Sequence, residues 1–335
     1  MSGHLAANWG VHLLHAGWQS AVVAGVAIAA VRALPRVSSR LRYALLLLAL
    51  VKFAVPPMLA LPSGLFSSGP GVGSAFFWPA ERPFVLGPAG LTSALLAIHA
   101  LGAAVVATLL VFRTVRLWLL VRRAAPAEVW LLELAAKAAA PLDLGLLPRI
   151  VVSAEATSPF VCGAWDPAVV IPRSLGSPSQ RSRLADVLAH ELCHVAARDP
   201  RDRLLEALLL PLWWWSPIFW LLSAELRRVR EERCDDLVLA LSLSSPRRYS
   251  LSLIEVARAA GREHGAIAMG GEPSHPLAPR LRRLADRGLT RSPRLGAGQL
   301  ALVALGALLI LPGVRPRGAV RVGVASGAHV HQHSH

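Results

Sequence analysis

The sequence is organised by long apolar stretches separated by shorter polar ones. A helix that crosses a bilayer needs about 20 mainly apolar residues. This length predicts three membrane-spanning helices near the N-terminus and a shorter one near the C-terminus. The first stretch is not a secretory signal, because no Lys or Arg lies among the first ten residues and a signal peptide begins with a basic region. The expected spans are residues 11–31, 43–61, 92–112 and 295–312.

Composition supports a membrane protein. The 335 residues are 54% hydrophobic and only 16% charged, with a mean hydropathy of +0.49, whereas soluble domains carry about 25% charged residues. The net charge of +15 raises the question of nucleic-acid binding. Direct nucleic-acid binding is not expected, because the arginines flank apolar segments and no nucleic-acid motif is present. The three cysteines are too few for a disulfide framework.

The basic residues orient the spans by the positive-inside rule. Residues 32–42 and 113–123 each carry four arginines, whereas the intervening loop, residues 62–91, carries one. The N-terminus is therefore expected outside, and the segment 113–294 on the cytoplasmic side of the inner membrane. Lys52 lies in the middle of the second span, where charge is costly, and we expect it to snorkel or to pair within the helix bundle.

Residues 126–294 show a different pattern, which predicts a folded domain. A helix is expected over 127–140, and a second over 180–198 with Ser177 or Ser179 as its N-cap. Between these helices, short apolar runs bounded by Pro, Gly and Asp predict a small β-sheet. The runs are residues 149–153, 159–163 and 168–172.

The helix at 180–198 carries the sequence His-Glu-Leu-Cys-His. His190 and His194 are four residues apart and lie on one helical face, so both imidazoles can bind one Zn²⁺. Glu191 projects about 100° away, where it can act as a general base on a water molecule. The alternative is a surface helix that carries two histidines without a metal.

A third ligand is expected from residues 225–240, which read as another helix rich in acids. Glu231 and Asp235 are four residues apart and share a face. One carboxylate can bind zinc while the other holds a ligand imidazole in place. The alternative is a solvated acidic face that pairs with nearby arginines, namely Arg227, Arg228, Arg230 and Arg233.

Residues 204–222 are long and apolar enough to cross the membrane. A crossing would separate His194 from Glu231 by about 30 Å of hydrocarbon, whereas zinc ligands bond at about 2 Å. The segment is therefore expected to enter and return, or to lie in the interface, with breaks at Pro211 and Pro217.

Together these elements resemble the BlaR/MecR family of integral-membrane zinc metallopeptidases, over most of residues 10–313. The His-Glu-x-x-His motif alone is shared with many zincins, whereas the ordered combination is far more specific. The four matching stretches are Gly163-Ala164-Trp165-Asp166-Pro167, residues 188–199 (LAHELCHVAARD), Trp215-Ser216-Pro217-Ile218-Phe219-Trp220 and Glu231-Glu232-Arg233-Cys234-Asp235.

The resemblance implies Zn²⁺ as cofactor, His190, His194 and Glu231 as its ligands, Glu191 as the base and Asp235 as the partner of a ligand imidazole. The fold class expected is a mainly α membrane protein with about four transmembrane helices. A cytoplasmic-side α+β zincin-like domain carries a small β-sheet and a re-entrant or interfacial hydrophobic hairpin. The expected domains are an N-terminal membrane domain (1–125), the metallopeptidase domain (126–294), a fourth span (295–313) and a short His-rich tail (314–335).

Two departures from the family pattern stand out. Ser216 replaces the usual Asn, which affects the hydrogen bonding of that loop but no ligand. The antibiotic sensors of the family carry a penicillin-binding domain after the last span. Here only residues 314–335 follow, without a Ser-x-x-Lys motif. The chain is therefore expected to be a version without that sensor, and its histidine-rich end, residues 329–335, a disordered tail.

The leading hypothesis is an endopeptidase that cleaves a protein substrate at the cytoplasmic membrane face, as regulatory proteolysis of a repressor-like protein or of itself. Its partners are the bilayer and the substrate, and a homo-oligomer is left open. An extended substrate could add to the sheet edge near Phe160–Cys162. The alternatives are a non-catalytic signal transducer with a structural zinc site closed by Cys234 or Glu232, and a prenyl-protein-protease-type processing peptidase.

Overall fold

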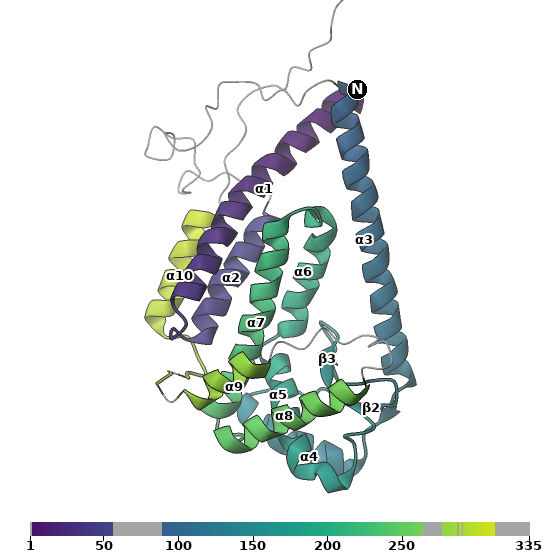
Figure 1. Ribbon diagram of the computed structural model, residues 1–335, viewed down its shortest axis with the longest axis vertical. Helices are drawn as coiled ribbons and strands as arrows, with labels where there is room; N and C mark the ends of the chain where they lie inside the picture. The colour runs from purple at the N-terminus through teal and green to yellow at the C-terminus, as the bar shows by residue number, and fades with distance from the viewer. Residues whose placement is uncertain (1, 56–88, 264–276, 287, 290, 312–335) are drawn as a thin grey trace, which may run out of the picture.

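The computed structural model describes residues 2–55, 89–263, 277–286, 288–289 and 291–311. Its upper part is a bundle of long apolar helices, and its lower part joins a small sheet to shorter amphipathic helices (Figure 1). Helix α7 (Pro217–Ala240) runs through both parts, because its first half packs in the bundle core and its second half in the core of the lower part. The two parts therefore share one helix.

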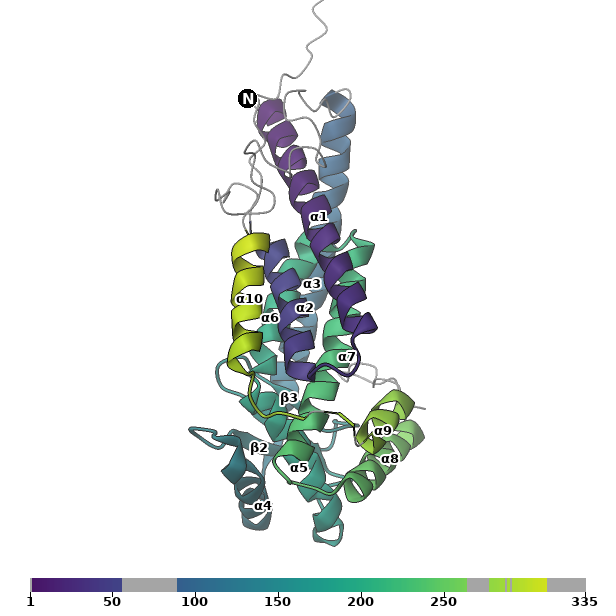
Figure 2. The ribbon, with the colours of Figure 1, turned by 90° about the vertical axis from the view of Figure 1, so that its left-hand side faces the viewer.

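Four apolar helices match the predicted spans in position. By length and composition, two of them can cross a membrane, over Ala16–Ala33 and Ser93–Arg123. The last helix is shorter, and the predicted span 43–61 is described only to residue 55. Figure 2 shows three of the helices side by side, while the fourth, α3, packs against α1 and α6. The helices are α1 (Ser2–Ala33), α2 (Ser39–Ala54), α3 (Ala89–Arg123) and α10 (Ala297–Ile310).

Residues 204–222 form a helical hairpin that enters the bundle and returns. Helix α6 (Asp199–Trp213) and α7 are joined by a tight turn at residues 214–216. A returning hairpin is the shape that one of the two predicted arrangements requires, but the prediction of a break at Pro211 is wrong. That proline lies inside α6, where its ring removes one backbone hydrogen bond without ending the helix.

The tip of the hairpin packs against α3 through a tryptophan side chain that lies over a glycine. The indole of Trp214 lies against Gly102 of α3, where an added Cβ would come within 2.3 Å of the ring. Its Nε1 also donates to the His99 carbonyl oxygen at 3.3 Å. A larger side chain at position 102 would therefore require the Trp214 indole to shift.

The sheet has the strand order β1-β2-β4-β3, with β2 and β4 parallel and the outer pairings antiparallel. Strand β3 therefore forms a free edge among the described strands. Gly163 follows β3 with φ of 90°, and an added Cβ would meet the Asp166 carbonyl oxygen at 2.2 Å, so only glycine fits this turn. The short strand β1 was not predicted. The strands are β1 (Ala125–Pro126), β2 (Arg149–Ser153), β3 (Phe160–Cys162) and β4 (Ala168–Pro172).

The sheet and the amphipathic helices enclose one apolar core, to which β2, β3 and β4 contribute buried aliphatic side chains. The prediction of a serine N-cap for the helix at 180–198 is wrong. A 3-10 helix (Pro178–Gln180) precedes it, and Ser177 makes no side-chain cap bond there. The helices of this part are α4 (Val129–Ala139) with a 3-10 turn (Ala140–Leu142), α5 (Arg181–Ala196), α8 (Pro246–Glu263) and α9 (Leu277–Ala285).

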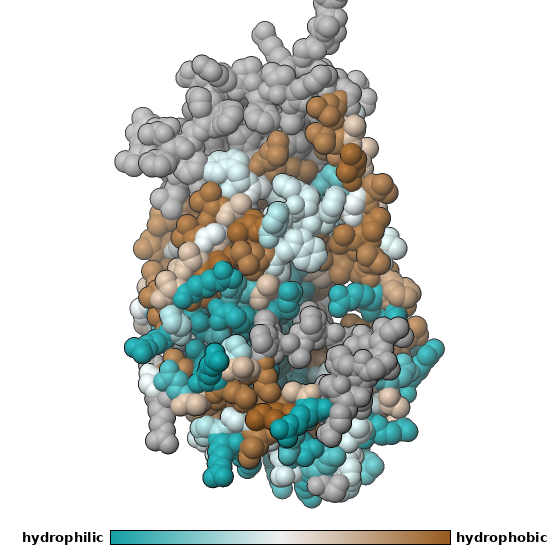
Figure 3. All heavy atoms as spheres, viewed as in Figure 1, coloured by the Kyte–Doolittle hydropathy of each residue, from teal (hydrophilic) through white to brown (hydrophobic). Residues whose placement is uncertain are grey.

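The surface divides in the same way as the fold. Apolar side chains dominate the upper half over α3 and α10, whereas hydrophilic side chains gather over the lower half (Figure 3). On α3 the apolar window is not buried at all. An exposed apolar surface of this extent fits contact with lipid.

Candidate metal centre

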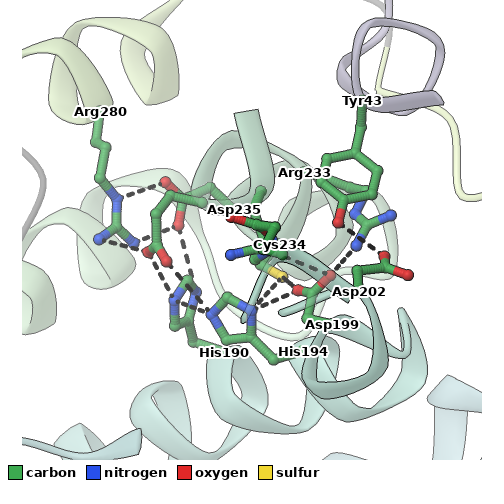
Figure 4. Close-up of polar contacts among 12 residues, drawn as sticks. Tyr43, His190, His194, Asp199, Asp202, Arg233, Cys234, Asp235 and Arg280 are labelled. Atoms are coloured by element: carbon green, nitrogen blue, oxygen red, sulfur yellow. Dashed lines mark hydrogen bonds and ion pairs between the residues drawn. The ribbon is translucent and has the colours of Figure 1, made fainter. Parts of the chain in front are cut away.

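Helix α5 places His190 and His194 next to each other in the interior, at the foot of the bundle. Their Nε2 atoms are 3.2 Å apart. The carboxylate of Glu231, from α7, meets both rings: Oε2 lies 3.3 Å from the His190 Nε2, and Oε1 lies 3.6 Å from the His194 Nε2. Figure 4 shows the two imidazole rings next to each other, with Asp235 and Arg280 near His190 and Asp199 near His194. The structure thus brings together three side chains that the sequence predicted as one site.

The spacing of these three donors suits a tetrahedral metal ion. Zinc bonds nitrogen and oxygen at about 2.0–2.2 Å, which places the donors of a tetrahedral site about 3.3–3.5 Å from one another. The observed separations of 3.2, 3.3 and 3.6 Å lie around this value. Two imidazoles and one carboxylate, completed by a water molecule, form a typical donor set of a catalytic zinc site.

The far nitrogen of His190 is held by a second group of side chains. The Tyr249 hydroxyl, from α8, lies 2.7 Å from the His190 Nδ1 and donates to the Asp235 Oδ1 at 2.6 Å. Arg280, from α9, binds both oxygens of Asp235 at 2.7–2.8 Å and reaches the Glu231 Oε2 at 3.1 Å. Asp235 therefore lies where the sequence predicted the partner of a ligand imidazole.

These charges shift the pKa values of the site in opposite directions. Burial alone lowers the pKa of His190, but hydrogen bonds to Asp235 and Glu231 outweigh it and raise this pKa to about 10. Burial alone raises the pKa of the Glu231 carboxyl, but Arg280 and the two histidines hold it well below its ordinary value. Without a metal, the site therefore pairs an ionised carboxylate with a protonated imidazole.

The far nitrogen of His194 is held differently. The Asp199 Oδ2 lies 2.6 Å from the His194 Nδ1, and the other Asp199 oxygen pairs with Arg233. The Cys234 Sγ lies 3.2 Å from the same nitrogen. Burial raises the pKa of the Asp199 carboxyl, but Arg233 and His194 outweigh this and keep it below its ordinary value. Asp199 thus remains an ionised hydrogen-bond acceptor for His194.

The other predicted residues lie nearby. Glu191 is buried on α5, one residue after His190. Cys193 packs in the apolar core. The Cys234 thiol faces the His194 Nδ1, the nitrogen that is turned away from Glu231. The Glu232 oxygens pair with Arg42 and Arg228.

Comparison with known families agrees with this geometry. The family model described as BlaR1 peptidase M56 matches residues 80–284, which include α5, α7 and the whole sheet. The chain belongs to the BlaR1 peptidase M56 family. This membership confirms the resemblance stated from the sequence and indicates a metallopeptidase. The family match, the two apolar helices and the exposed apolar surface together indicate a membrane protein.

A curated relative supports the M56 assignment. The regulatory protein BlaR1 of Bacillus licheniformis is 32% identical over 82 residues. The matched stretch covers 24% of this chain and 14% of that protein. The aligned region therefore spans only about one seventh of the length of this curated relative.

Three residues that contact the candidate metal ligands were not predicted with a role: Asp199, Tyr249 and Arg280. Asp199 is the last residue of the stretch 188–199 that resembles the family. Its distance along the sequence from His194 does not show that its side chain turns back to that ring. The turn depends on Arg198, which adopts a left-handed conformation with φ of 61°. Tyr249 and Arg280 lie 59 and 90 residues after His190, so no helical spacing links them to it.

Proposed function

We propose that this chain is a membrane-embedded, zinc-dependent endopeptidase that cleaves proteins at the cytoplasmic membrane face. His190, His194 and Glu231 hold the zinc, and Glu191 is the catalytic base. The observation that carries the proposal is the separation of the three donors, 3.2–3.6 Å, which suits a tetrahedral ion with one position left for water. The M56 membership supports the same chemistry.

In the proposed mechanism, one residue of this chain transfers the proton and others position the zinc ligands. A bound Zn²⁺ supplies Lewis acidity, which activates water near neutral pH and polarises the scissile carbonyl. Glu191 takes the proton as the water attacks and then passes it to the leaving amine. Asp235 and Tyr249 hold His190 through its Nδ1, and Asp199 holds His194 through its Nδ1. Both Nε2 atoms are thereby directed to the metal.

The peptide substrate is proposed to bind along β3. This strand is at the edge of the sheet and packs beside α5, the helix that carries both histidines. An edge strand offers unpaired backbone groups to an extended peptide. Main-chain pairing of this kind would hold a segment of many different sequences next to the metal, as an endopeptidase requires.

The substrate is proposed to be a regulatory protein, either a repressor-like protein or another copy of this chain. The support is the name of the curated relative, a regulatory protein, together with the position of the site at the foot of the membrane bundle. A repressor released by cleavage would carry a signal from the membrane to the cytoplasm.

A structural zinc site is less well supported by the geometry. It would need a fourth protein ligand, and Cys234 and Glu232 were the candidates. The thiol faces the wrong nitrogen of His194 for this role, and the carboxylate of Glu232 is engaged by two arginines.

The function is tested by measuring metal and cleavage on the same preparation of the full chain. We expect about one Zn²⁺ per chain and chelator-sensitive cleavage of casein or of the chain itself. A chain that binds stoichiometric zinc but cleaves neither substrate would favour the signal transducer.

The membrane orientation makes a separate prediction. A reporter fused after Arg123 should be cytoplasmic, because arginines cluster at that end of α3. A reporter fused at Ser67, outside the described residues, should be external. Paired enzymatic and fluorescent reporters at both positions would measure this. An external reading after Arg123 would place the metal centre on the opposite face.

Metal binding should depend strongly on pH. His190 has a pKa raised to about 10 in the metal-free protein, and zinc binds the deprotonated imidazole. Below this pKa, each pH unit upward increases the deprotonated fraction about tenfold, so zinc affinity should rise by about that factor per unit. Chelator competition between about pH 6.5 and 8.5 would measure the slope. A flat profile would show that His190 is already neutral before zinc binds.

A further inference from the structure

The two histidines of the metal centre are held by side chains from different parts of the fold. Asp235, Tyr249 and Arg280, which surround the His190 Nδ1, belong to α7, α8 and α9. Asp199, which binds the His194 Nδ1, begins α6. The next contacts outward from Asp199 reach the membrane bundle, as Figure 4 shows.

The second oxygen of Asp199 has one close arginine partner, Arg233, while the Arg230 Nε lies farther away, 3.8 Å from the same oxygen. The Asp199 carboxylate is 1% exposed, and a buried charge is costly unless it is paired and hydrogen-bonded. The Arg233 guanidinium, from α7, pairs with the Asp199 Oδ1 while the Oδ2 binds His194. The direction of the Asp199 carboxylate is therefore set by where Arg233 lies.

Arg233 in turn lies on an aromatic ring from the membrane bundle. Its guanidinium carbon is 3.7 Å from the centre of the Tyr43 ring, which α2 supplies. Tyr43 is 2% exposed, and its hydroxyl donates to the Asp202 Oδ2 at 2.7 Å. A desolvated cation over an aromatic face is attracted to it and held in a defined plane. Tyr43 thus fixes the position of Arg233.

We propose that Tyr43, Arg233 and Asp199 are positioning residues that make the metal affinity of the centre depend on how α2 is seated against α7. The inference rests on the proposed function, namely that His190, His194 and Glu231 bind a divalent zinc-type ion. A displacement of α2 withdraws the Tyr43 ring, frees Arg233, and releases the Asp199 carboxylate from the orientation that keeps the His194 Nε2 directed to the metal.

The coupling is tested by measuring zinc affinity of the full chain in detergent by chelator competition, with visible absorption of the Co²⁺-substituted protein as a second readout. Asp199→Asn should weaken zinc binding about 10–100-fold, the usual effect of losing a partner of a ligand imidazole. Tyr43→Leu, which removes the ring, should weaken it about threefold to tenfold. Both should also alter the Co²⁺ spectrum, because the His194 ring is no longer fixed.

Two variants serve as controls for α2. Tyr43→Phe keeps the ring over Arg233 and should recover most of the affinity lost in Tyr43→Leu. Ser39→Ala removes another hydrogen bond between α2 and α7, from Ser39 to the Asp236 Oδ2 at 2.6 Å, and Asp236 pairs with Arg283 of α9 rather than with Arg233. This variant should leave zinc affinity unchanged. An equal loss in Ser39→Ala would show general loosening and overturn the coupling through Tyr43.

The decisive measurement is the double variant. If Tyr43 acts through Asp199, then adding Tyr43→Leu to Asp199→Asn should cause no further loss of zinc affinity. Fully additive losses would overturn the inference, as would wild-type affinity and spectrum in Tyr43→Leu. Should Tyr43→Leu fail to fold, Arg233→Lys carries the same test, because it keeps the charge but loses the stacked plane. A wild-type chain that binds no zinc overturns the proposed function as well.

Discussion

Replacement of Glu191 by glutamine should abolish peptide cleavage and leave the zinc content close to that of the wild type. Glutamine keeps the size and the hydrogen-bonding groups of the side chain but cannot accept a proton at neutral pH. Two groups of described side chains could hold a metal ion, His190 with His194 and Glu231, and His194 with Asp199 and Cys234. Neither group includes Glu191, so the variant removes no donor. Turnover should fall by at least about 10²-fold, the usual scale for a lost general base.

The measurement needs zinc content and cleavage rate from one preparation of each variant. Glu255→Gln provides a matched control, because it makes the same chemical change on α8, in a partly exposed ion pair with Arg183. It should cleave at the wild-type rate. If Glu191→Gln also cleaves at that rate, the proposed mechanism is wrong and the transducer hypothesis takes its place.

The second large effect is expected from loss of a metal ligand. His190→Ala or His194→Ala should empty the site, because two protein ligands cannot hold zinc as three do. Glu231→Gln should also lose most of the metal, since a neutral amide is a much poorer zinc ligand than a carboxylate. Asp235→Asn should retain zinc with affinity reduced about 10–100-fold.

Zinc content by elemental analysis identifies the variants that lose the metal. Affinity by chelator competition identifies the variant that keeps it but binds it more weakly. Cys234→Ala is the informative control, because the structural-site hypothesis makes this thiol a fourth ligand. We expect the variant to keep one zinc per chain. Loss of zinc in Cys234→Ala, or full zinc in both histidine variants, would refute the ligand assignment.

The metal donors were predictable because local spacing determines them. His190 and His194 are one helical turn apart, so any helix over this stretch presents both to the same point. The distal Glu231 was reached through its four-residue spacing from Asp235 and through family resemblance. Strands β2 and β4 were also predicted with their observed bounds, because buried β-branched runs give a strong local signal.

The residues that hold the ligands were not predictable in the same way. Tyr249 and Arg280 reach the site only because α8 and α9 fold back over α7, which is a tertiary arrangement without a periodic signal. The alternative to a metal site was an acidic helix face that pairs with arginines of its own sequence neighbourhood. Arg228 does so, but Asp235 and Asp236 pair instead with Arg280 and Arg283 of α9.

The contacts between α2 and the acidic half of α7 mean that the peptidase cannot be separated from its membrane helices. A soluble fragment beginning at residue 126 would lack Arg42, which is 2% exposed and pairs with Glu232. Glu232 would keep its ion pair with Arg228 but lose its buried partner from α2, which weakens a buried ion-pair network. The fragment would also expose the apolar face of α7 that α1 and α2 cover. Inactivity of such a fragment would therefore reflect misfolding. Peptidase activity should be assayed on the intact polytopic protein.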